Sequence, residues 1–226
     1  PNPEVYFQIL RQCQALKVIW PELDALWGVP NPAEHHPEVC SGEHTMLVLK
    51  QAVKLSPQSA KTPKSKIRFA ALCHDLGKAL TPKSQWPKHH GHEKLGIKLV
   101  EQSCLRFKVP NSYRDLALKA CEYHLIVHRA FELKPSTILK LLDSCKAYKD
   151  LVLLTELLLV CCADSRGRIG KEDAIYPQQA YLLEQANQIR QVIAKPFVDS
   201  GLQGKAIKEA MTNAQLEKIA AFKQSL

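Results

Sequence analysis

The sequence predicts an all-α fold. Apolar residues recur at helical spacing in almost every informative stretch of the 226-residue chain. No stretch alternates between apolar and polar residues for long enough to argue for a β-sheet. With 46% hydrophobic and 23% charged residues, the composition is that of an ordinary globular protein that can bury a sizeable core.

The amino-terminal half contains four of the expected helices. A first helix is expected over residues 3–20, where one face would carry Val5, Ile9, Cys13, Leu16 and Ile19. Further helices are expected over 43–55, 65–78 and 91–106. Gly77 suits a carboxy-terminal helix cap, because glycine adopts the left-handed backbone conformation found there.

The carboxy-terminal half continues the helical pattern. Helices are expected over 112–131, over 136–147 with Pro135 just before a serine cap, over 150–165, over 177–193 and over 206–224. The most apolar run, residues 151–162, is interrupted by Thr155 and Glu156 and is shorter than the roughly 20 apolar residues that span a bilayer. We therefore expect no membrane association.

A break in the helical pattern predicts the domain organisation. Residues 194–204 contain proline and glycine, so we expect a main helical bundle over 1–193 and a helical carboxy-terminal extension over 194–226. The chain starts without an initiator methionine and without a basic-then-apolar signal pattern, which favours a fragment of a longer protein.

The eight cysteines favour a reduced cytoplasmic protein. No two are spaced as a C-x-x-C pair, and six sit among apolar neighbours. Free cysteine behaves as a small buried hydrophobe, so we expect these thiols in the core. The six are Cys73, Cys104, Cys121, Cys145, Cys161 and Cys162.

Positive charge is concentrated in one window. The chain carries a net charge of +9, and residues 54–94 contain nine basic residues against the two acids Asp75 and Glu93. Such a field favours an anionic ligand such as phosphate, although a solvated lysine face explains the charge equally well. Two loops rich in proline, serine and lysine, 56–66 and 81–92, flank the helix in this window.

Four polar residues occur where the pattern predicts burial. His44 lies in an apolar helix, His74 and Asp75 are neighbours in another, and Asp164 closes the greasiest helix. Two imidazoles and two carboxylates suit an octahedral divalent ion with open positions for water. In the alternative interpretation each group is satisfied by its own local hydrogen bond.

The order of these residues along the chain, first His44, then His74 with Asp75, then Asp164, resembles the HD superfamily of metal-dependent phosphohydrolases, as does the stretch HDLGK. The stretches WPELDALWGVPNP, CHDLGKALTP, HHGHEKLGIKLVEQ, ADSRGR and GLQGKAI are similar to the carboxy-terminal part of bacterial CCA-adding tRNA nucleotidyltransferases. The resemblance implies a helical HD domain with 2′,3′-cyclic phosphodiesterase, 2′-nucleotidase and phosphatase activities. It implies a divalent metal, nickel or magnesium, with manganese, cobalt or iron as further candidates.

The same resemblance implies the partners. The substrates would be tRNA or RNA 3′ ends and 2′,3′-cyclic nucleotides, and the protein partners would be an amino-terminal nucleotidyltransferase head and a second copy in a homodimer. Nothing in this chain resembles such a head. One position departs from the family pattern: Cys40 stands where the family usually has an acid, which predicts weaker activity without loss of a metal ligand.

Four further residues are catalytic candidates. His92 and His124 suit phosphate binding or proton relay, because histidine titrates near neutral pH, although His124 fits a core position equally well. Arg166 and Arg168 follow the last aspartate and suit a phosphate, or alternatively a helix carboxy terminus. His89 and His90, in the polar loop, are expected to be solvated.

Two other functions remain open at this point. One is a non-catalytic module for tRNA binding and dimerisation with a vestigial metal site. The other is a stand-alone HD-type nucleotidase that acts on mononucleotides. The intact ligand set favours hydrolysis over the first, and the stretch beyond residue 194 favours the tRNA-maturation context over the second.

Overall fold

The computed structural model describes residues 2–34, 36–56 and 63–225. Regular structure within these ranges is helical, apart from one isolated antiparallel bridge between Pro30 and Cys40. The predicted all-α fold is therefore confirmed. None of the described helices is long and apolar enough to cross a membrane.

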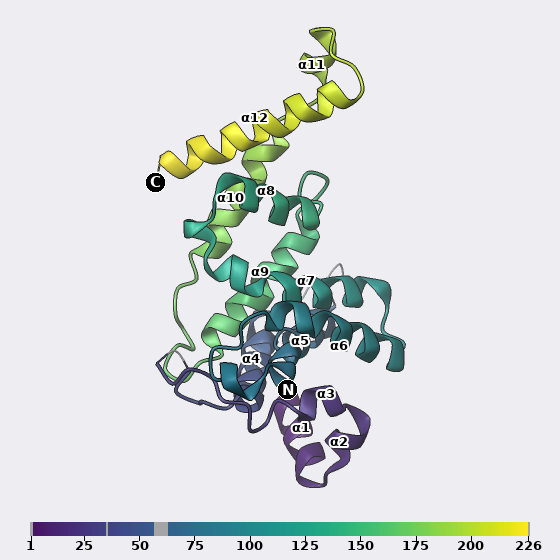
Figure 1. The fold of residues 1–226 in the computed structure, drawn as a ribbon, viewed down its shortest axis with the longest axis vertical. Coiled ribbons are helices and arrows are strands. Elements are labelled where there is room, and N and C mark those ends of the chain that lie inside the picture. Colours follow the sequence, from purple (N-terminus) through teal and green to yellow (C-terminus); the bar gives the residue numbers. More distant parts are fainter. Residues whose placement is uncertain (1, 35, 57–62, 226) are drawn as a thin grey trace. The chain divides into compact units, whose positions relative to one another are not determined.

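The chain forms two compact units (Figure 1). The first comprises residues 1–128 and 156–176, and the second comprises 129–155 and 177–226. The division expected at 193/194 remains a prediction.

The first unit is a helical bundle preceded by three short helices. In it, α5 packs against α4 and α7, and α6 packs against α7 and the 3₁₀ helix η1. Its elements are α1 (Pro3–Gln12), α2 (Ala15–Ile19), α3 (Pro21–Asp24), α4 (Ser41–Leu55), α5 (Lys64–Cys73), η1 (Leu76–Leu80), η2 (Lys83–Gln85), α6 (His92–Arg106), α7 (Asn111–His128) and most of α9 (Val152–Arg166).

The second unit is built around α12, which packs against α8 and α10. Aromatic rings connect these elements: the Tyr181 ring lies 4.6 Å from that of Phe131 and 6.0 Å from that of Phe222, measured between centroids. The elements are η3 (Ala130–Glu132), α8 (Pro135–Ser144), the first turn of α9, α10 (Gln178–Arg190), α11 (Lys195–Asp199) and α12 (Lys205–Gln224).

Two expected helices have different boundaries. The helix expected over 3–20 is broken at Gln14, whose φ of 59° lies in the left-handed region and cannot continue a right-handed helix. The helix at 136–147 begins one residue earlier, with Pro135 in its first turn and Lys134 as the N-cap without a side-chain hydrogen bond. Proline suits this first turn because its missing N–H has no helical partner there, so the serine cap was a wrong prediction.

The helix expected over 65–78 also ends early. Helix α5 stops at Cys73, and Gly77 lies inside η1 instead of capping α5. A Cβ atom at Gly77 would collide with the carbonyl oxygen of His92 and would lie 2.5 Å from the amide nitrogen of Gly96. Gly77 therefore serves close packing between η1 and α6, not a left-handed cap.

Candidate metal centre

The four predicted ligands converge within the first unit. His44 lies on α4, His74 and Asp75 directly follow α5, and Asp164 lies on α9. Each is buried, with at most 3% of its surface exposed. The early end of α5 matters here: His74 keeps helical angles, whereas Asp75 leaves the helix with φ −110° and ψ 6°. The two neighbouring side chains can therefore approach the same point.

The distances between their polar atoms are those of a shared site. His44 Nε2 lies 3.0 Å from Asp164 Oδ1, and His74 Nε2 lies 3.8 Å from the same oxygen. His74 Nε2 lies 3.2 Å from Asp75 Oδ2. One atom each from His44, His74 and Asp75 lies within 4.8 Å of the others, which suits ligands of one ion.

Unsatisfied polar atoms support a cation at this point. Nε2 of His74 and Oδ1 of Asp75 are buried and make no well-directed hydrogen bond among the described residues, although charged or polar side chains lie 3.2 to 3.5 Å from each. Nδ1 of His74 lies 2.7 Å from the carbonyl oxygen of Ala71, which places the ring proton on Nδ1 and leaves the Nε2 lone pair for a ligand bond. Because buried polar atoms are costly when unpaired, the donor set fits a divalent ion.

The carboxylates stay ionised in spite of their burial. Burial raises the pKa of Asp75, but the charges of His74 and Lys78 outweigh it and hold that pKa well below its usual value. The pKa of Asp164 is lowered in the same way, against its burial, by His128 and His74. Burial lowers the pKa of His74, yet Asp75 and Asp164 raise it to about 9 in the metal-free protein. Both carboxylates are thus available as anionic ligands for a cation.

The comparison with known proteins agrees with this geometry. A family model described as the HD domain matches residues 42–166, a range that contains all four predicted ligands. The chain belongs to the HD domain family. It is also 49% identical over 211 residues to the Multifunctional CCA protein of Mannheimia succiniciproducens, a match that covers 93% of this chain. The chain spans about half the length of that curated relative.

A second group of donors lies on the other side of Asp75 in this HD domain. Nε2 of His92 and Nε2 of His124 lie 3.2 and 3.5 Å from Asp75 Oδ1, and 3.2 Å from each other. Their Nδ1 atoms face the carbonyl oxygens of His89 and Ala120, so with an ion bound the protons would sit on Nδ1 and the converging Nε2 atoms would be the ligand atoms. The three side chains meet the geometry of a metal-binding group, with Asp75 common to both groups.

His128 is a site residue that the sequence analysis missed. Its Nε2 lies 2.7 Å from Asp164 Oδ2, and its Nδ1 lies 2.9 Å from the hydroxyl of Tyr176. The signal was present, because His128 follows His124 by four residues on α7 and so shares its helix face. Glu38 and His36, beside His44, were also missed, since loop residues carry no periodic pattern.

The two candidate arginines have different surroundings. Nε of Arg166 donates to the carbonyl oxygen of Ala174 at 2.9 Å, which ties α9 to the loop that follows it. Nε of Arg168 is buried and has no hydrogen-bond partner among the described residues. The geometry therefore favours Arg168 over Arg166 for an anionic ligand.

Other expectations about polar residues need correction. His89 is buried, not solvated: its ring nitrogens lie 2.6 Å from the Thr81 hydroxyl and 2.6 Å from the Pro30 carbonyl oxygen. His90 is exposed as expected. Two lysines of the basic window are internal: Lys66 pairs with Glu156, and Lys78 lies 2.7 Å from Asp75 Oδ2.

The predicted positions of the cysteines are confirmed where they concern the core. All six cysteines that have apolar neighbours in the sequence are buried. Cys40, where the resemblance leads one to expect an acid, is half-buried, and its thiol lies 4.0 Å from the carbonyl oxygen of Leu26.

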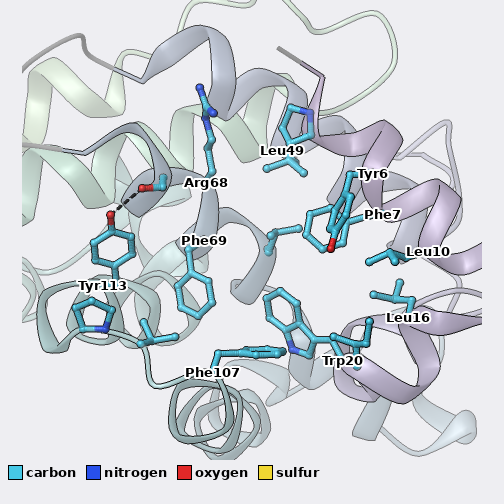
Figure 2. A pocket seen from close by; sticks show the side chains of 16 residues that line it. Tyr6, Phe7, Leu10, Leu16, Trp20, Leu49, Arg68, Phe69, Phe107 and Tyr113 are labelled. Atoms are coloured by element: carbon cyan, nitrogen blue, oxygen red, sulfur yellow. Dashed lines mark hydrogen bonds between the residues drawn. The ribbon is translucent and has the colours of Figure 1, made fainter.

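A separate apolar cavity of about 460 Å³ lies between α1 and α5 (Figure 2). Trp20 stacks on Phe69 at 5.9 Å between ring centroids, and Phe107 meets Trp20 edge-on at 5.2 Å. Arg68 is the one charged residue in its lining among the described residues. This cavity contains none of the predicted metal ligands.

Proposed function

We propose that the chain is the metal-dependent phosphohydrolase part of a multifunctional CCA protein. It hydrolyses 2′,3′-cyclic phosphodiesters, 2′-nucleotides and phosphate monoesters at RNA 3′ ends, in tRNA maturation and repair. The observation that carries the proposal is the buried convergence of His44, His74, Asp75 and Asp164, whose facing polar atoms lie 3.0 to 3.8 Å apart. The similarity to a Multifunctional CCA protein supplies the tRNA context.

The same four residues would hold the ion. When bound there, a divalent metal polarises the phosphoryl oxygens and lowers the pKa of water to generate a nucleophile near neutral pH. Nitrogen and oxygen donors suit nickel, magnesium, manganese, cobalt or iron, and cells select among these by availability as well as affinity.

The chain's own residues prepare this chemistry. The Lys78 ammonium lies 2.7 Å from Asp75 Oδ2 and 3.0 Å from Asn31 Oδ1, so it fixes the carboxylate and neutralises part of its charge. We infer that Arg168, whose buried Nε has no hydrogen-bond partner among the described residues, contacts a phosphate oxygen of the substrate. His92 and His124 fit a second ion shared through Asp75. Without that ion, either ring in its protonated form donates to phosphate, which is the role predicted from the sequence.

Hydrolysis of 2′,3′-cyclic AMP tests the proposal. The protein is stripped with EDTA and then supplied in turn with nickel, cobalt, manganese and magnesium. We expect no activity with EDTA, activity with at least one metal, and none in His74→Ala or Asp75→Ala. His90→Ala, which changes an exposed histidine, is the matched control and should keep full activity.

Three outcomes would contradict the proposal. Full activity in folded His74→Ala or Asp75→Ala would remove the metal from the mechanism. Inactivity with every metal, combined with retained tRNA binding, would instead support a non-catalytic tRNA-binding module. Hydrolysis of mononucleotides with no turnover of oligonucleotide ends would support a stand-alone nucleotidase. The homodimer, the cytoplasmic location and the nucleotidyltransferase head also remain predictions.

A further inference from the structure

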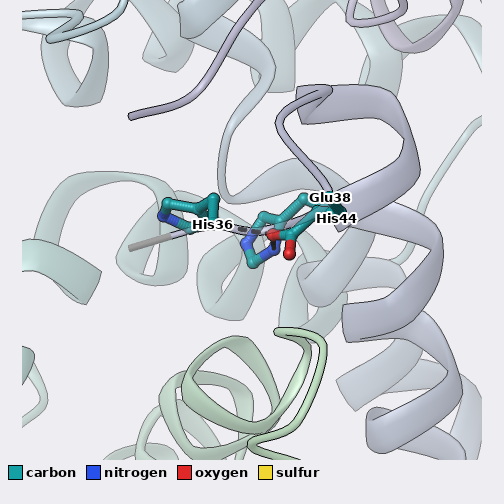
Figure 3. A group of neighbouring side chains, drawn as sticks. All are labelled: His36, Glu38 and His44. Atoms are coloured by element: carbon teal, nitrogen blue, oxygen red, sulfur yellow. Dashed lines mark hydrogen bonds and ion pairs between the residues drawn. The ribbon is translucent and has the colours of Figure 1, made fainter. Parts of the chain in front are cut away.

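Glu38 occupies a buried position between two histidines (Figure 3). Its Oε1 lies 2.9 Å from His44 Nδ1 and 2.8 Å from His36 Nδ1, and its side chain is 3% exposed. The rings of His36 and His44 meet edge-on, with their centroids 4.6 Å apart. Neither Glu38 nor His36 belongs to the proposed ligand set.

One donor atom from each of these three side chains lies within 4.8 Å of the others, which is close enough for a separate metal ion, but the tautomer of His44 argues against one. Nδ1 of His44 lies 3.1 Å from the carbonyl oxygen of Gly167 as well as beside Glu38. Two oxygen acceptors at one nitrogen keep the proton there, because a deprotonated Nδ1 would face both oxygens without a hydrogen bond. When an ion binds, the lone pair of His44 is therefore on Nε2, which in the metal-free protein lies 3.0 Å from Asp164 Oδ1.

The backbone presents Glu38 to His44 through a turn held at several points. Val39 has a φ of 54°, in the left-handed region that β-branched residues rarely adopt. The amide of Val39 donates to the His36 carbonyl oxygen at 2.8 Å, and its own carbonyl oxygen accepts from the amide of Asn31. The amide of Ser41 donates to the Val29 carbonyl oxygen at 2.9 Å. These bonds specify the turn on both sides of Glu38.

We propose that Glu38 is a positioning residue that fixes the tautomer and ring orientation of His44 for the metal, and that His36 holds the Glu38 carboxylate in place. A carboxylate that accepts the second N–H of a ligand histidine orients the ring and makes it a stronger donor. The inference rests on the proposed function, because it concerns how strongly the same site binds its ion. It adds two residues that neither the sequence pattern nor the family match assigns.

Calorimetric titration of the metal-free protein with Mn²⁺ and with Ni²⁺ tests the role of Glu38. Glu38→Ala should raise the dissociation constant about 10- to 100-fold without changing the number of ions bound. Glu38→Gln, which keeps an oxygen acceptor but loses the charge, should give a smaller increase. Glu34→Gln is the matched control, because Glu34 is an exposed carboxylate in the same loop, and its dissociation constant should equal that of wild type.

The role of His36 is tested by combining variants. If His36 acts through Glu38, His36→Ala should weaken metal binding less than Glu38→Ala, and the double variant should bind no more weakly than Glu38→Ala alone. Additive losses would show that His36 acts independently and would overturn that half of the proposal. Circular dichroism of each metal-free variant confirms folding, and the isosteric Glu38→Gln provides the comparison if Glu38→Ala does not fold.

Failure of this inference is separable from failure of the proposed function. Wild-type affinity in both Glu38 variants, with binding lost in Asp164→Asn, would refute the positioning role and leave the metal site intact. Loss of one ion from the stoichiometry in Glu38→Ala would show that Glu38 is itself a ligand and would also refute it. Wild-type binding in Asp164→Asn would count against the site itself.

Discussion

The protonation states of single residues at this site depend on the charges around them, and His74 shows this most directly. It is fully buried, which by itself lowers the pKa of an imidazole, yet the adjacent carboxylates of Asp75 and Asp164 raise that pKa to about 9. A metal needs the neutral ring, so the proton and the ion compete for His74. Stability and metal affinity should therefore respond to pH in opposite directions.

The metal-free protein should lose stability as the pH rises from about 6.5 to 9. Because the pKa of His74 is higher in the folded state than the usual value near 6.5, its contribution is complete below that value and disappears as the pH passes about 9. We expect a loss of up to about 3 kcal/mol in the free energy of unfolding. Urea denaturation in EDTA at pH 6.5 and 9 measures it, and His74→Gln, which cannot titrate, should flatten the dependence.

Stabilisation by added Mn²⁺ should increase as the pH rises from about 6.5 to 9. Less proton competition at pH 9 than at pH 6.5 means tighter binding and a larger metal-induced increase in melting temperature. A pH-independent stability of the metal-free protein, with His74→Gln behaving as wild type, would show that His74 does not carry the raised pKa.

Residue identities explain which parts of the site the sequence revealed. His44, His74, Asp75 and Asp164 were detectable because each interrupts an apolar helix, where a polar side chain needs a reason. Glu38 and His36 lie in a loop, where polar residues are the rule. Their importance depends on the left-handed turn at Val39, and a valine gives no sequence signal for that conformation.

At the scale of elements, the contact of η1 with α6 determines how the two donor groups share Asp75. Gly77 in η1 and Gly96 in α6 approach so closely that a Cβ atom on Gly96 would lie 3.1 Å from the amide nitrogen of Gly77. Helix α6 begins at His92, so its distance from η1 fixes the distance of the His92 ring from Asp75.

Gly77→Ala should separate these two elements. The added methyl group would collide with the backbone of His92 and Gly96, and backbone atoms cannot rotate away. We expect a loss of about 1–3 kcal/mol in the free energy of unfolding, as is typical of overpacked interiors, together with weaker metal binding at the His92 and His124 group. Gly170→Ala is the control: no atom lies within 4 Å of its added Cβ, and its φ of 79° adds only a backbone cost. Equal losses of unfolding free energy in the two variants would show that the close packing of η1 against α6 adds nothing specific to stability.

The element boundaries were the weaker part of the sequence analysis, for physical reasons. Periodicity located α4, α6, α7, α9, α10 and α12 to within a few residues, because each carries apolar residues at helical spacing. It missed the break at Gln14, since apolar spacing continues across a residue whose backbone conformation changes. It also misassigned Gly77, because a glycine that permits close packing and a glycine that caps a helix look alike in sequence.

At the scale of the whole molecule, only some of the basic residues in the window 54–94 lie on the surface. Lys66 and Lys78 are internal, each paired with a buried carboxylate. Lys61 lies outside the described residues. The exposed members are Lys54, Lys64, Lys83, Lys88 and Lys94, and these five are available to neutralise phosphates.

Binding of tRNA should therefore depend on salt, but less steeply than nine contacts would require. Each phosphate contact with single-stranded RNA contributes a slope of about −0.7 to the log–log plot, so we expect a slope between about −2 and −4. Fluorescence anisotropy between 50 and 200 mM salt, roughly the range in which such contacts weaken, gives this slope. The triple change Lys83→Gln, Lys88→Gln, Lys94→Gln should reduce it by about 2, whereas Lys17→Gln, outside the window, should not. Salt-independent affinity would assign these lysines to solubility alone.

The central claim for the whole molecule is that Asp164, from the second half of the HD match, completes a metal site with residues from the first half. Asp164→Asn keeps the size of the side chain and removes one negative charge. Titration of EDTA-stripped wild type and Asp164→Asn with Ni²⁺, followed by calorimetry and by melting temperature, tests this claim most directly. We predict that the dissociation constant for Ni²⁺ is at least about tenfold larger in the variant and that the metal raises its melting temperature little. Equal affinity and equal metal-induced stabilisation in the two proteins would contradict the claim.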